Sequence, residues 1–242
     1  MAFILSEDEK GILTSPVAWV NHFIICASQN LLKEQYPHVQ GFQAPTLAQT
    51  FAMEPPRGEF VQVLNISGNH WITISTLGCV SGSVNVYDSL HLKLSSTTKK
   101  LVADLLMTRN KAIAVRYNNV QWQKGGDDCG LFAVAFATSL CEGHDPAAIC
   151  YDQSQMCNHL LSCITAGKIT PFPQRPSNRR AKVCRDETEE IPVFCICRLP
   201  DDGNIMIKCS QCSEWYHKSC IRLPDKYFTN KNLSWSCSQC KQ

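Results

Sequence analysis

The sequence predicts an α+β fold followed by a small metal-binding module. In the first part of the chain, segments with apolar residues at helical spacing flank a block of short strands rich in β-branched residues. The chain has 242 residues, of which 44% are hydrophobic and 18% charged, which suits one larger globular domain and a small one. Seven of the 15 cysteines lie between Cys195 and Cys240. Such clustering in an intracellular protein indicates metal binding rather than disulfides.

The overall charge and hydropathy argue against two classes of function. The net charge is only +2, so we expect no direct nucleic-acid partner held by a basic surface. No uninterrupted apolar stretch approaches the roughly 18 residues that span a bilayer. The apolar start of the chain runs from Met1 to Leu5 and then becomes acidic, without the basic region of a signal peptide. We therefore expect neither a membrane protein nor a secreted one.

Two helices are predicted at the start of the chain. Ser6 and Glu9 form a capping-box pattern for a short first helix. Ser15 and Pro16 offer an N-cap and a first-turn proline for a second helix, which should reach about Leu32. The apolar residues of this second segment recur at helical spacing, namely Val20, Phe23, Ile24, Ala27 and Leu31.

From Glu59 onward the apolar period changes from that of a helix to that of a strand. The segment contains three short groups of β-branched residues, which are Val61, Val63 and Ile66, then Ile72 and Ile74, then Val84 and Val86. The turn-forming triplets 67–69 and 81–83 separate these groups. The pattern predicts an antiparallel run of three strands.

The second half of the larger domain alternates helix and strand signals. Leucine spacing predicts a helix over 95–107, and Ala112 to Val115 read as a strand. The almost wholly apolar segment 131–140 must be a helix that is buried on most sides. A last amphipathic helix, over 152–164, is stopped by Gly167.

Residues 173–192 change character and are predicted to form a charged linker between a domain over 1–172 and a module over 193–242. Prolines and a mixture of basic and acidic residues leave this segment unable to bury a core. Its basic residues are Arg175, Arg179, Arg180, Lys182 and Arg185. We favour a solvated tether, and the alternative is a nuclear-import signal.

The cysteines of the last module are paired in the way that zinc requires. The eight candidate ligands are Cys195, Cys197, Cys209, Cys212, His217, Cys220, Cys237 and Cys240. Eight soft ligands make two tetrahedral zinc sites with none left over. Roughly 48 residues cannot enclose a sufficient core, so the metal would supply the folding free energy. The alternative, cysteines packed as small hydrophobic residues, predicts neither the pairing nor the histidine.

This segment resembles a PHD finger, with Trp215-Tyr216-His217 before Cys220 and Trp235 two residues before Cys237. The resemblance implies a cross-brace, in which Cys195, Cys197, His217 and Cys220 hold one zinc, and Cys209, Cys212, Cys237 and Cys240 hold the other. It also implies a histone H3 tail as the partner and chromatin as the target. The positions that match a methyl-lysine cage are Phe194, Met206 and Trp215. The alternative is that Phe194 and Met206 fill a small core.

Upstream of the finger, a set of polar residues has the composition of a cysteine-protease site. His70 begins a predicted strand, Asp88 ends the next, and Gln123 lies six residues before Cys129. A cysteine at the amino end of a helix meets unpaired N–H groups and the positive end of the dipole, which favour a thiolate nucleophile. A histidine can take the thiol proton, a carboxylate can fix its tautomer, and a glutamine can stabilise the oxyanion. Singly, each of these residues is as common in packing or turns.

Residues 5–172 resemble the SUMO-specific and related ubiquitin-like-protein protease family. The resemblance lies in His-Trp, Asp-Ser and Gln-x-x-x-x-Asp-Cys-Gly, together with Trp19-Val-Asn. It implies a papain-like fold with helices around a central mixed sheet, the triad His70, Asp88 and Cys129, and Gln123 as oxyanion donor. Trp19 and Trp71 would line a tunnel that admits only the Gly-Gly terminus of the modifier. Two positions depart from the family, since His22 replaces an aspartate and Gly125 replaces an asparagine; the first affects substrate contacts and the second only loop geometry.

Together these features predict a nuclear thiol isopeptidase that cleaves after the Gly-Gly terminus of SUMO or another ubiquitin-like modifier. The finger would direct it to modified chromatin proteins by tethering, which does not need a contact between the domains. One alternative is a catalytically silent chromatin- and modifier-binding adaptor, and a second is acyl transfer by the same triad. The other cysteines and histidines without a matching ligand set are expected to be structural, namely Cys26, Cys141, Cys163, His91, His144 and His159.

Overall fold

The computed structural model describes residues 5–15, 19–177, 187–230 and 232–241. The helices are α1 (Glu7–Thr14), α2 (His22–Gln35), α3 (Ser96–Leu106), α4 (Cys129–Cys141), α5 (Met156–Ala166) and α6 (Lys226–Thr229), with 3-10 turns η1 (Pro45–Ala48), η2 (Pro146–Ala148), η3 (Gln153–Gln155) and η4 (Lys218–Cys220). The strands are β1 (Gln40–Gly41), β2 (Phe60–Ile66), β3 (His70–Ser75), β4 (Ser83–Tyr87), β5 (Ala112–Tyr117), β6 (Ile149–Tyr151), β7 (Gln174–Pro176), β8 (Glu187–Pro192), β9 (Met206–Lys208) and β10 (Trp215–His217). Within the described ranges, no helix is both long and apolar enough to cross a membrane.

The two N-terminal helices begin at different kinds of cap. Ser6 and Glu9 form the predicted capping box, because each side chain accepts the other residue's backbone N–H. The second helix starts later than predicted. Pro16 lies outside the described residues, and the Asn21 side chain caps α2 by accepting the N–H of Ile24 at 3.0 Å. Asparagine is as good an N-cap as serine, so the helix begins at His22.

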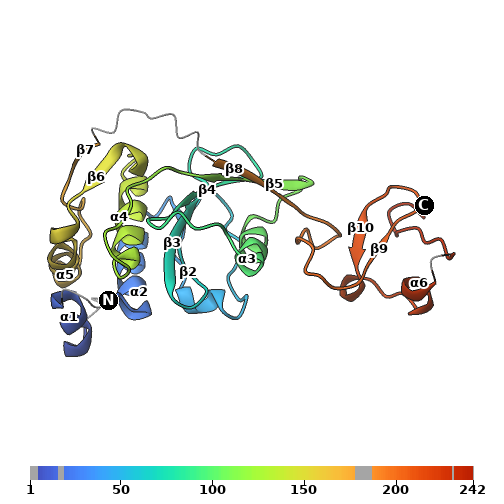
Figure 1. The fold of residues 1–242 in the computed structure, drawn as a ribbon, viewed down its shortest axis with the longest axis horizontal. Helices are drawn as coiled ribbons and strands as arrows, with labels where there is room; N and C mark the ends of the chain where they lie inside the picture. The colour runs from blue at the N-terminus through green and yellow to red at the C-terminus, as the bar shows by residue number, and fades with distance from the viewer. Residues whose placement is uncertain (1–4, 16–18, 178–186, 231, 242) are drawn as a thin grey trace.

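Six strands form one mixed sheet in the order β1-β2-β3-β4-β5-β8 (Figure 1). Strands β2, β3 and β4 make the predicted antiparallel run. Strand β5 pairs parallel to β4, and α3 lies between these two strands in the chain. The mixed sheet with helices around it is therefore confirmed.

The sheet separates two apolar cores, because alternate residues of a strand face opposite sides. Val61 and Val63 of β2 pack in a first core with α1, α2, α4 and α5. Leu64 and Ile66 of the same strand pack in a second core with α3. The two cores together hold β2 and β3 from both faces of the sheet. Because β3 begins at His70, this packing also fixes the position of the His70 backbone.

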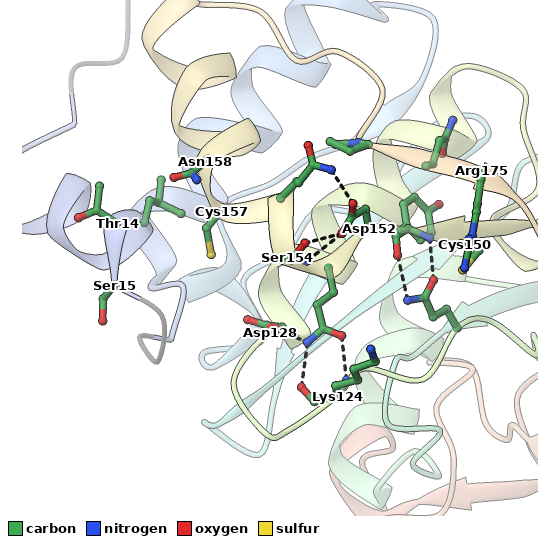
Figure 2. A pocket seen from close by; sticks show the side chains of 17 residues that line it. Thr14, Ser15, Lys124, Asp128, Cys150, Asp152, Ser154, Cys157, Asn158 and Arg175 are labelled. Atoms are coloured by element: carbon green, nitrogen blue, oxygen red, sulfur yellow. Dashed lines mark hydrogen bonds between the residues drawn. The ribbon is translucent and has the colours of Figure 1, made fainter.

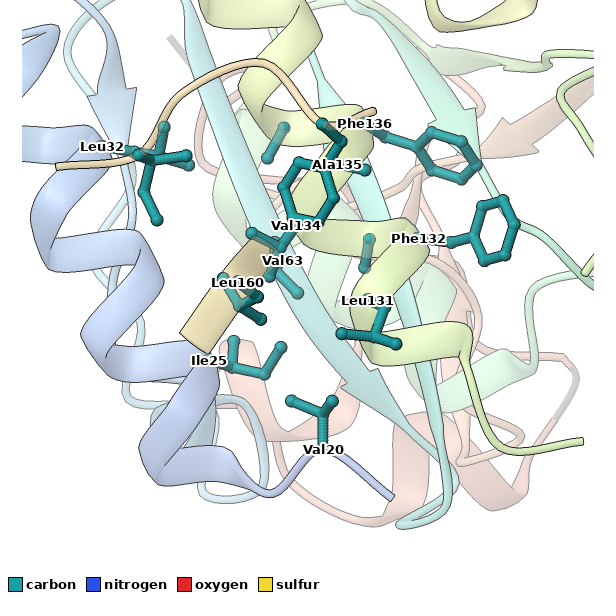
Figure 3. Close-up of a cluster of buried hydrophobic side chains, with 14 of the residues drawn as sticks. Val20, Ile25, Leu32, Val63, Leu131, Phe132, Val134, Ala135, Phe136 and Leu160 are labelled. Atoms are coloured by element: carbon teal, nitrogen blue, oxygen red, sulfur yellow. The ribbon is translucent and has the colours of Figure 1, made fainter. Parts of the chain in front are cut away.

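Helix α4 is the centre of the first core, and the prediction of a helix buried on most sides is confirmed. All but one of its 13 residues are buried. Figure 3 shows Ile25 of α2 and Leu131 in the space between α2 and α4, whereas Phe132 and Phe136 leave α4 on the side away from α2. This burial holds the N-terminus of α4, at Cys129, in a fixed place beside the sheet.

Strand β8 differs from the prediction of a solvated tether over 173–192. It pairs antiparallel with β5 over six residues, from Glu187 opposite Tyr117 to Pro192 opposite Ala112. The Ile191 side chain is 2% exposed and packs in the second core. Without β8, strand β5 would be an open edge of the sheet with unpaired backbone groups. Strand β7 also pairs with β6, while the basic residues Arg179, Arg180, Lys182 and Arg185 lie outside the described residues.

The chain passes directly from β8 into the C-terminal module, and the two parts are in contact. The Val193 N–H donates to the carbonyl of Lys111 at 3.0 Å, which extends the β5–β8 ladder by one bond. The Arg198 guanidinium donates to the carbonyl of Arg109 at 3.2 Å. Tethering does not need a contact between the domains, but at this junction there is one, because β8 belongs to the sheet (Figure 1).

Candidate active site and metal centre

The His70 and Asp88 side chains lie side by side between neighbouring strands. His70 is the first residue of β3, and Asp88 directly follows β4, which pairs with β3. The Nε2 atom of His70 lies 2.7 Å from Oδ1 of Asp88. Both residues are buried, with 5% and 4% of their surface exposed. The sequence prediction placed them on one sheet, and the structure brings them into hydrogen-bond contact.

Asp88 is held by the turn that follows it. Its Oδ1 also accepts the N–H of Leu90 and its Oδ2 accepts the N–H of Leu92, both at 2.8 Å. A buried carboxylate that accepts three hydrogen bonds cannot rotate freely. The Asp88 carboxylate can therefore fix the orientation and the tautomer of His70.

Cys129 is the third member of this group and lies at the first position of α4. Its side chain is buried and free of any disulfide. Burial lowers the pKa of His70, but hydrogen bonds to Asp88 and to Cys129 raise it by more, so the net effect is to raise the pKa to about 9. Because Nε2 is taken by Asp88, the ring nitrogen that remains for the thiol is Nδ1. The imidazole thus lies between a carboxylate and a thiol.

Gln123 is held by Ser89, the serine of the Asp-Ser motif, to which the sequence analysis gave no role. The Ser89 hydroxyl donates to Oε1 of Gln123 at 2.6 Å, and the Gln123 N–H donates to the Ser89 carbonyl at 3.1 Å. One hydrogen of Nε2 goes to the carbonyl of Gly125 at 3.1 Å. The Ser89 bond fixes which end of the amide is the donor, and the second Nε2 hydrogen remains for a ligand. Ser89 follows Asp88 in the sequence, and that adjacency was the signal.

Gly125 explains one of the two departures from the family pattern. Its φ is +79°, in the left-handed region that glycine and asparagine tolerate best. Glycine in place of asparagine therefore preserves the path of the loop between Gln123 and Cys129. The other departure, His22, is the first residue of α2 and contacts the ring of Phe23, with ring centroids 4.0 Å apart.

The two predicted tunnel tryptophans have different surroundings. The Trp19 indole is 43% exposed, and its Nε1 donates to Oδ1 of Asp127, two residues before Cys129. Trp71 is only 5% exposed, and its Nε1 donates to the carbonyl of Val20 at 3.1 Å. The tunnel stays a prediction, and of the two tryptophans Trp19 is the one whose ring is exposed to solvent. Asp127 was not singled out in the sequence.

A cavity of about 1090 Å³ is lined in part by the segment between Gln121 and Asp128 (Figure 2). Asp128, the residue before Cys129, is part of its wall together with Lys124. Neither His70, Asp88 nor Cys129 lines it. The remaining wall comes from the end of α1, from Gln121 and from residues 150–155, 157–158 and 173–175.

The C-terminal module gathers its candidate ligands into two groups of four. One group is Cys195, Cys197, His217 and Cys220, and the other is Cys209, Cys212, Cys237 and Cys240. The ligand atoms within each group all lie within 4.8 Å of one another. This is the grouping that the cross-brace predicts.

The donor atoms also have the chemistry and spacing of tetrahedral metal sites. The Cys212 and Cys237 sulfur atoms are 3.9 Å apart, close to the edge of about 3.8 Å of a tetrahedron with metal–sulfur bonds of about 2.3 Å. His217 directs Nδ1 to within 3.2 Å of the Cys197 sulfur, while its Nε2 contacts the Pro200 carbonyl at 3.2 Å. A backbone contact at the second nitrogen fixes the ligating tautomer. The two groups therefore fit a soft divalent ion.

The three predicted cage residues are only partly brought together. Trp215 and Met206 lie on the paired strands β10 and β9 as diagonal neighbours, since Trp215 is opposite Lys208. Trp215 is 42% exposed, and Met206 is partly buried. Phe194 packs against the core of the finger. The methyl-lysine cage stays a prediction, and the alternative of a core role fits Phe194.

The remaining cysteines and histidines have surroundings that fit structural roles. His91 stacks on Trp122 with ring centroids 4.4 Å apart, and Nε2 of His159 contacts the Thr170 carbonyl at 3.1 Å. Burial raises the pKa of Cys141 to about 12 and also raises that of Cys26. Neither environment activates a thiol.

Comparisons with known proteins agree with both parts of this description. Residues 195–240 match the PHD-finger family model, and this segment is a PHD finger. The chain is 35% identical over 51 residues to the Set1 complex component spp1 of Schizosaccharomyces pombe. It is 39% identical over 59 residues to the Transcription initiation factor TFIID subunit 3 of Gallus gallus. These matches cover 21% and 24% of this chain, but only 12% and 6% of the two relatives.

The larger part of the chain has the fold of a solved protease. It is similar to the SUMO protease Ulp1 with the catalytic cysteine oxidised to a sulfinic acid, with a TM-score of 0.56 over 68% of this chain and 85% of that chain. The two sequences are 14% identical, so this similarity establishes the fold. The predicted protease fold joined to a PHD finger is confirmed.

Proposed function

We propose that this protein is a cysteine isopeptidase that cleaves after the Gly-Gly terminus of SUMO or another ubiquitin-like modifier. The observation that carries the proposal is the buried His70 ring between the Asp88 carboxylate and the Cys129 thiol, at the N-terminus of α4. The Ulp1-like fold supports it, because the compared protein is itself a SUMO protease. The protease unit consists of the domain predicted over 1–172 with the addition of β8, and the finger follows from residue 193.

Each residue of the site has one task in the proposed reaction. The Cys129 sulfur attacks the carbonyl carbon of the terminal glycine, and its proton is held by Nδ1 of His70. The negative charge that develops on the carbonyl oxygen is stabilised by the free Nε2 hydrogen of Gln123 and by the Cys129 N–H. His70 then gives its proton to the departing lysine amine, and the amide C–N bond breaks. This step leaves the modifier attached to Cys129 as a thioester.

The second half of the reaction restores the enzyme. A water molecule attacks the thioester carbonyl while His70 takes one of the water's protons. The bond between carbon and the Cys129 sulfur breaks, and the modifier leaves with a free carboxylate. Asp88 stabilises the imidazolium in both halves through its bond to Nε2. The exposed indole of Trp19 provides a flat wall for glycines, which have no side chain to clash.

The finger is proposed to hold two zinc ions and to bind the histone H3 tail. Zinc suits three or four thiolates with tetrahedral spacing, and the two groups in the finger would hold one ion each. When bound, zinc supplies folding free energy to a module that is too small for a sufficient core. The exposed Trp215 beside Met206 supports recognition of a methylated lysine. A nuclear location agrees with a transcription initiation factor among the relatives.

The isopeptidase proposal is tested with modifiers that carry an electrophile at the carboxy-terminus. We expect one modifier of a panel containing SUMO and ubiquitin to form a covalent adduct with Cys129. The adduct should vanish in Cys129→Ser. Its yield should fall strongly in His70→Gln, because the Cys129 thiol loses the base that takes its proton. If the protein is folded and no modifier labels it, the result would favour the alternative of a catalytically silent adaptor that binds chromatin and the modifier.

Turnover separates hydrolysis from acyl transfer by the same triad. The protein is incubated with a modifier–lysine conjugate, with and without an added amine acceptor. Release of the modifier as a free carboxylate is expected in both cases. Transfer of the modifier to the acceptor as the main product would favour acyl transfer instead.

The histone-reading proposal is tested by peptide titration. Histone H3 tail peptides with an unmodified and with a trimethylated lysine are titrated into the full chain and into a Trp215→Ala variant. We expect tighter binding of the methylated peptide, and about tenfold weaker binding by the variant, because the ring face that attracts the cation is removed. Equal weak binding of both peptides would reject the cage.

A further inference from the structure

The segment from Gln121 to Asp128, here called the oxyanion loop, needs external support. It lies between β5 and α4 without regular secondary structure of its own, carries the proposed donor Gln123, and ends at Cys129. It contains Gly125 and Gly126, and no atom lies within 4 Å of where a Cβ would be at either glycine. Glycines in open space give a loop conformational freedom rather than rigidity. The position of Gln123 must therefore be fixed by contacts from outside the loop.

One support comes from Gln121, at the start of the loop. Its Nε2 donates to the carbonyl of Tyr151 at 3.1 Å, and its Oε1 accepts the N–H of Tyr151 at 2.6 Å. The carboxamide pairs with both backbone groups of one residue, as a neighbouring strand would. Tyr151 is the last residue of β6 and is buried, so the loop is attached to a fixed element.

A second support comes from Gln153 of η3 and acts on the other end of the loop. Its Oε1 accepts the N–H of Lys124 at 2.9 Å, and its Nε2 donates to the carbonyl of Lys124 at 2.8 Å. The other Nε2 hydrogen goes to Oδ2 of Asp128, the N-cap residue of α4. Figure 2 shows Lys124 and Asp128 on the same wall of the cavity, with the hydrogen bonds that reach them.

These bonds account for all three polar positions of the Gln153 amide. Its acceptor and one donor go to the residue after Gln123, and its second donor goes to the residue before Cys129. On the opposite side of the loop, Ser89 binds the side chain and the backbone of Gln123. Gln153 thus spans the two groups that would stabilise the oxyanion, the Gln123 amide and the Cys129 N–H.

We propose that Gln153 is a positioning residue, which holds Lys124 and Asp128 so that Gln123 and Cys129 face one point. This inference rests on the proposed isopeptidase function. Gln153 itself touches neither the thiol nor the imidazole in any described contact, and it acts through the oxyanion loop. A loop released at this end would keep its nucleophile but lose the alignment of its donors.

The test compares Gln153→Ala and Gln153→Glu with Gln155→Ala as a matched control. Gln155 lies in the same turn, but its amide contacts Asp152 and not the loop. Gln153→Glu keeps the volume of the side chain, yet it replaces both donors by an acceptor next to the Asp128 carboxylate. We expect both Gln153 variants to lower kcat about 10- to 100-fold with little change in KM, and the control to resemble the wild type. The thermal unfolding midpoint should stay close to that of the wild type in all three.

Two further measurements separate alignment from damage to the nucleophile and do not need a modifier. Alkylation of Cys129 by iodoacetamide needs no oxyanion donor, so its rate should change less than about threefold in the Gln153 variants. Backbone amide exchange across residues 122–130 should be faster in both Gln153 variants and unchanged in Gln155→Ala. Gln153→Ala removes the acceptor of the Lys124 N–H, whereas Gln153→Glu places a carboxylate against the Lys124 carbonyl and the Asp128 carboxylate and so pushes the loop away. An unchanged exchange rate, or a control as impaired as Gln153→Ala, would overturn the proposal.

The two proposals can fail separately. If the wild-type chain neither labels nor cleaves any modifier, the isopeptidase proposal fails, and amide exchange still decides whether Gln153 holds the loop. If the wild type cleaves and exchange rises in the Gln153 variants, but kcat does not fall, the loop is held by Gln153 without serving catalysis, and the positioning role is rejected.

Discussion

At His70, burial and hydrogen bonding shift the pKa of the imidazole in opposite directions. Removing an imidazole from water disfavours its charged form, whereas a carboxylate at 2.7 Å favours it. Burial is the largest single effect, but the hydrogen bonds and charges of Asp88 and Cys129 together outweigh it, so the pKa of His70 is raised to about 9 from an ordinary 6.5. The site is therefore suited to hold the proton that a leaving amine will need.

The raised pKa predicts how stability depends on pH. The folded protein holds the His70 proton more tightly than the unfolded chain, so this contribution is fully present below about pH 6.5 and is lost as pH rises through about 9. We expect the free energy of unfolding in urea to fall between these values in the wild type, and to fall less in His70→Gln. Equal pH slopes in the two proteins would contradict the shift.

Residues with a characteristic neighbour could be predicted from the sequence, and residues that act through a distant contact could not. Cys129 before an apolar helix, and His70 and Asp88 at the ends of predicted strands, became candidates through the joint motif that resembles the protease family. Gln153 lies 29 and 25 residues from the two loop residues that it binds, and nothing in the local sequence distinguishes it from Gln155. Trp71 was predicted to line a tunnel, but its burial depends on how the chain around Val20 packs.

At the scale of elements, alternation and caps located the long helices and the strands of the central antiparallel run, and β8 is the longest described element that they missed. The run of acidic residues from Glu187 to Glu190 has low strand propensity and reads as solvated. Its structure comes from its neighbours in the fold. Lys99 of α3 pairs with Glu189, and the hydroxyl of Tyr117, on the partner strand β5, donates to Glu189 at 2.8 Å. The spacing of Ile191 and Val193, which are both buried, was the available signal.

The packing of β8 gives a stability prediction for a segment that the sequence describes as a tether. Ile191→Ala should lower the free energy of unfolding of the protease unit by about 2 to 4 kcal/mol, because a fully buried side chain leaves a cavity in the second core. Glu190→Ala is the control, since Glu190 is exposed, and it should change stability by less than about 0.5 kcal/mol. Urea unfolding measures both, and equal effects would show that β8 does not belong to the cooperative unit.

At the scale of the whole molecule, two units depend on different sources of stability. The protease unit has two extended apolar cores, whereas the finger has a small cluster around Cys195, Tyr216 and Trp235. A small cluster of this kind does not offset the entropy of folding without metal. The junction at Val193 bonds to the sheet and not to the metal ligands.

Removal of metal should therefore unfold one unit and spare the other. Metal analysis of the fresh protein should find two zinc ions per chain, and a strong chelator should release both. We expect amide exchange across 195–240 to become fast, histone-peptide binding to vanish, and cleavage of a soluble modifier substrate to stay within about twofold of its starting rate. A large loss of cleavage after chelation would show that the sheet depends on the finger.

The junction between the protease unit and the finger is too short to let the two units move freely relative to each other. Val193 is bonded to Lys111, Cys195 is already a candidate ligand, and only Phe194 separates them. A long flexible linker would let the active site reach a wide range of distances from a histone tail bound to the finger. A junction of one residue restricts the active site to a narrow range of distances. Under the proposed function, a histone tail bound to the finger would therefore fix the distance from the tail at which the active site can reach. The chain would select conjugates by the distance between the modified lysine and that tail, as well as by their chemistry.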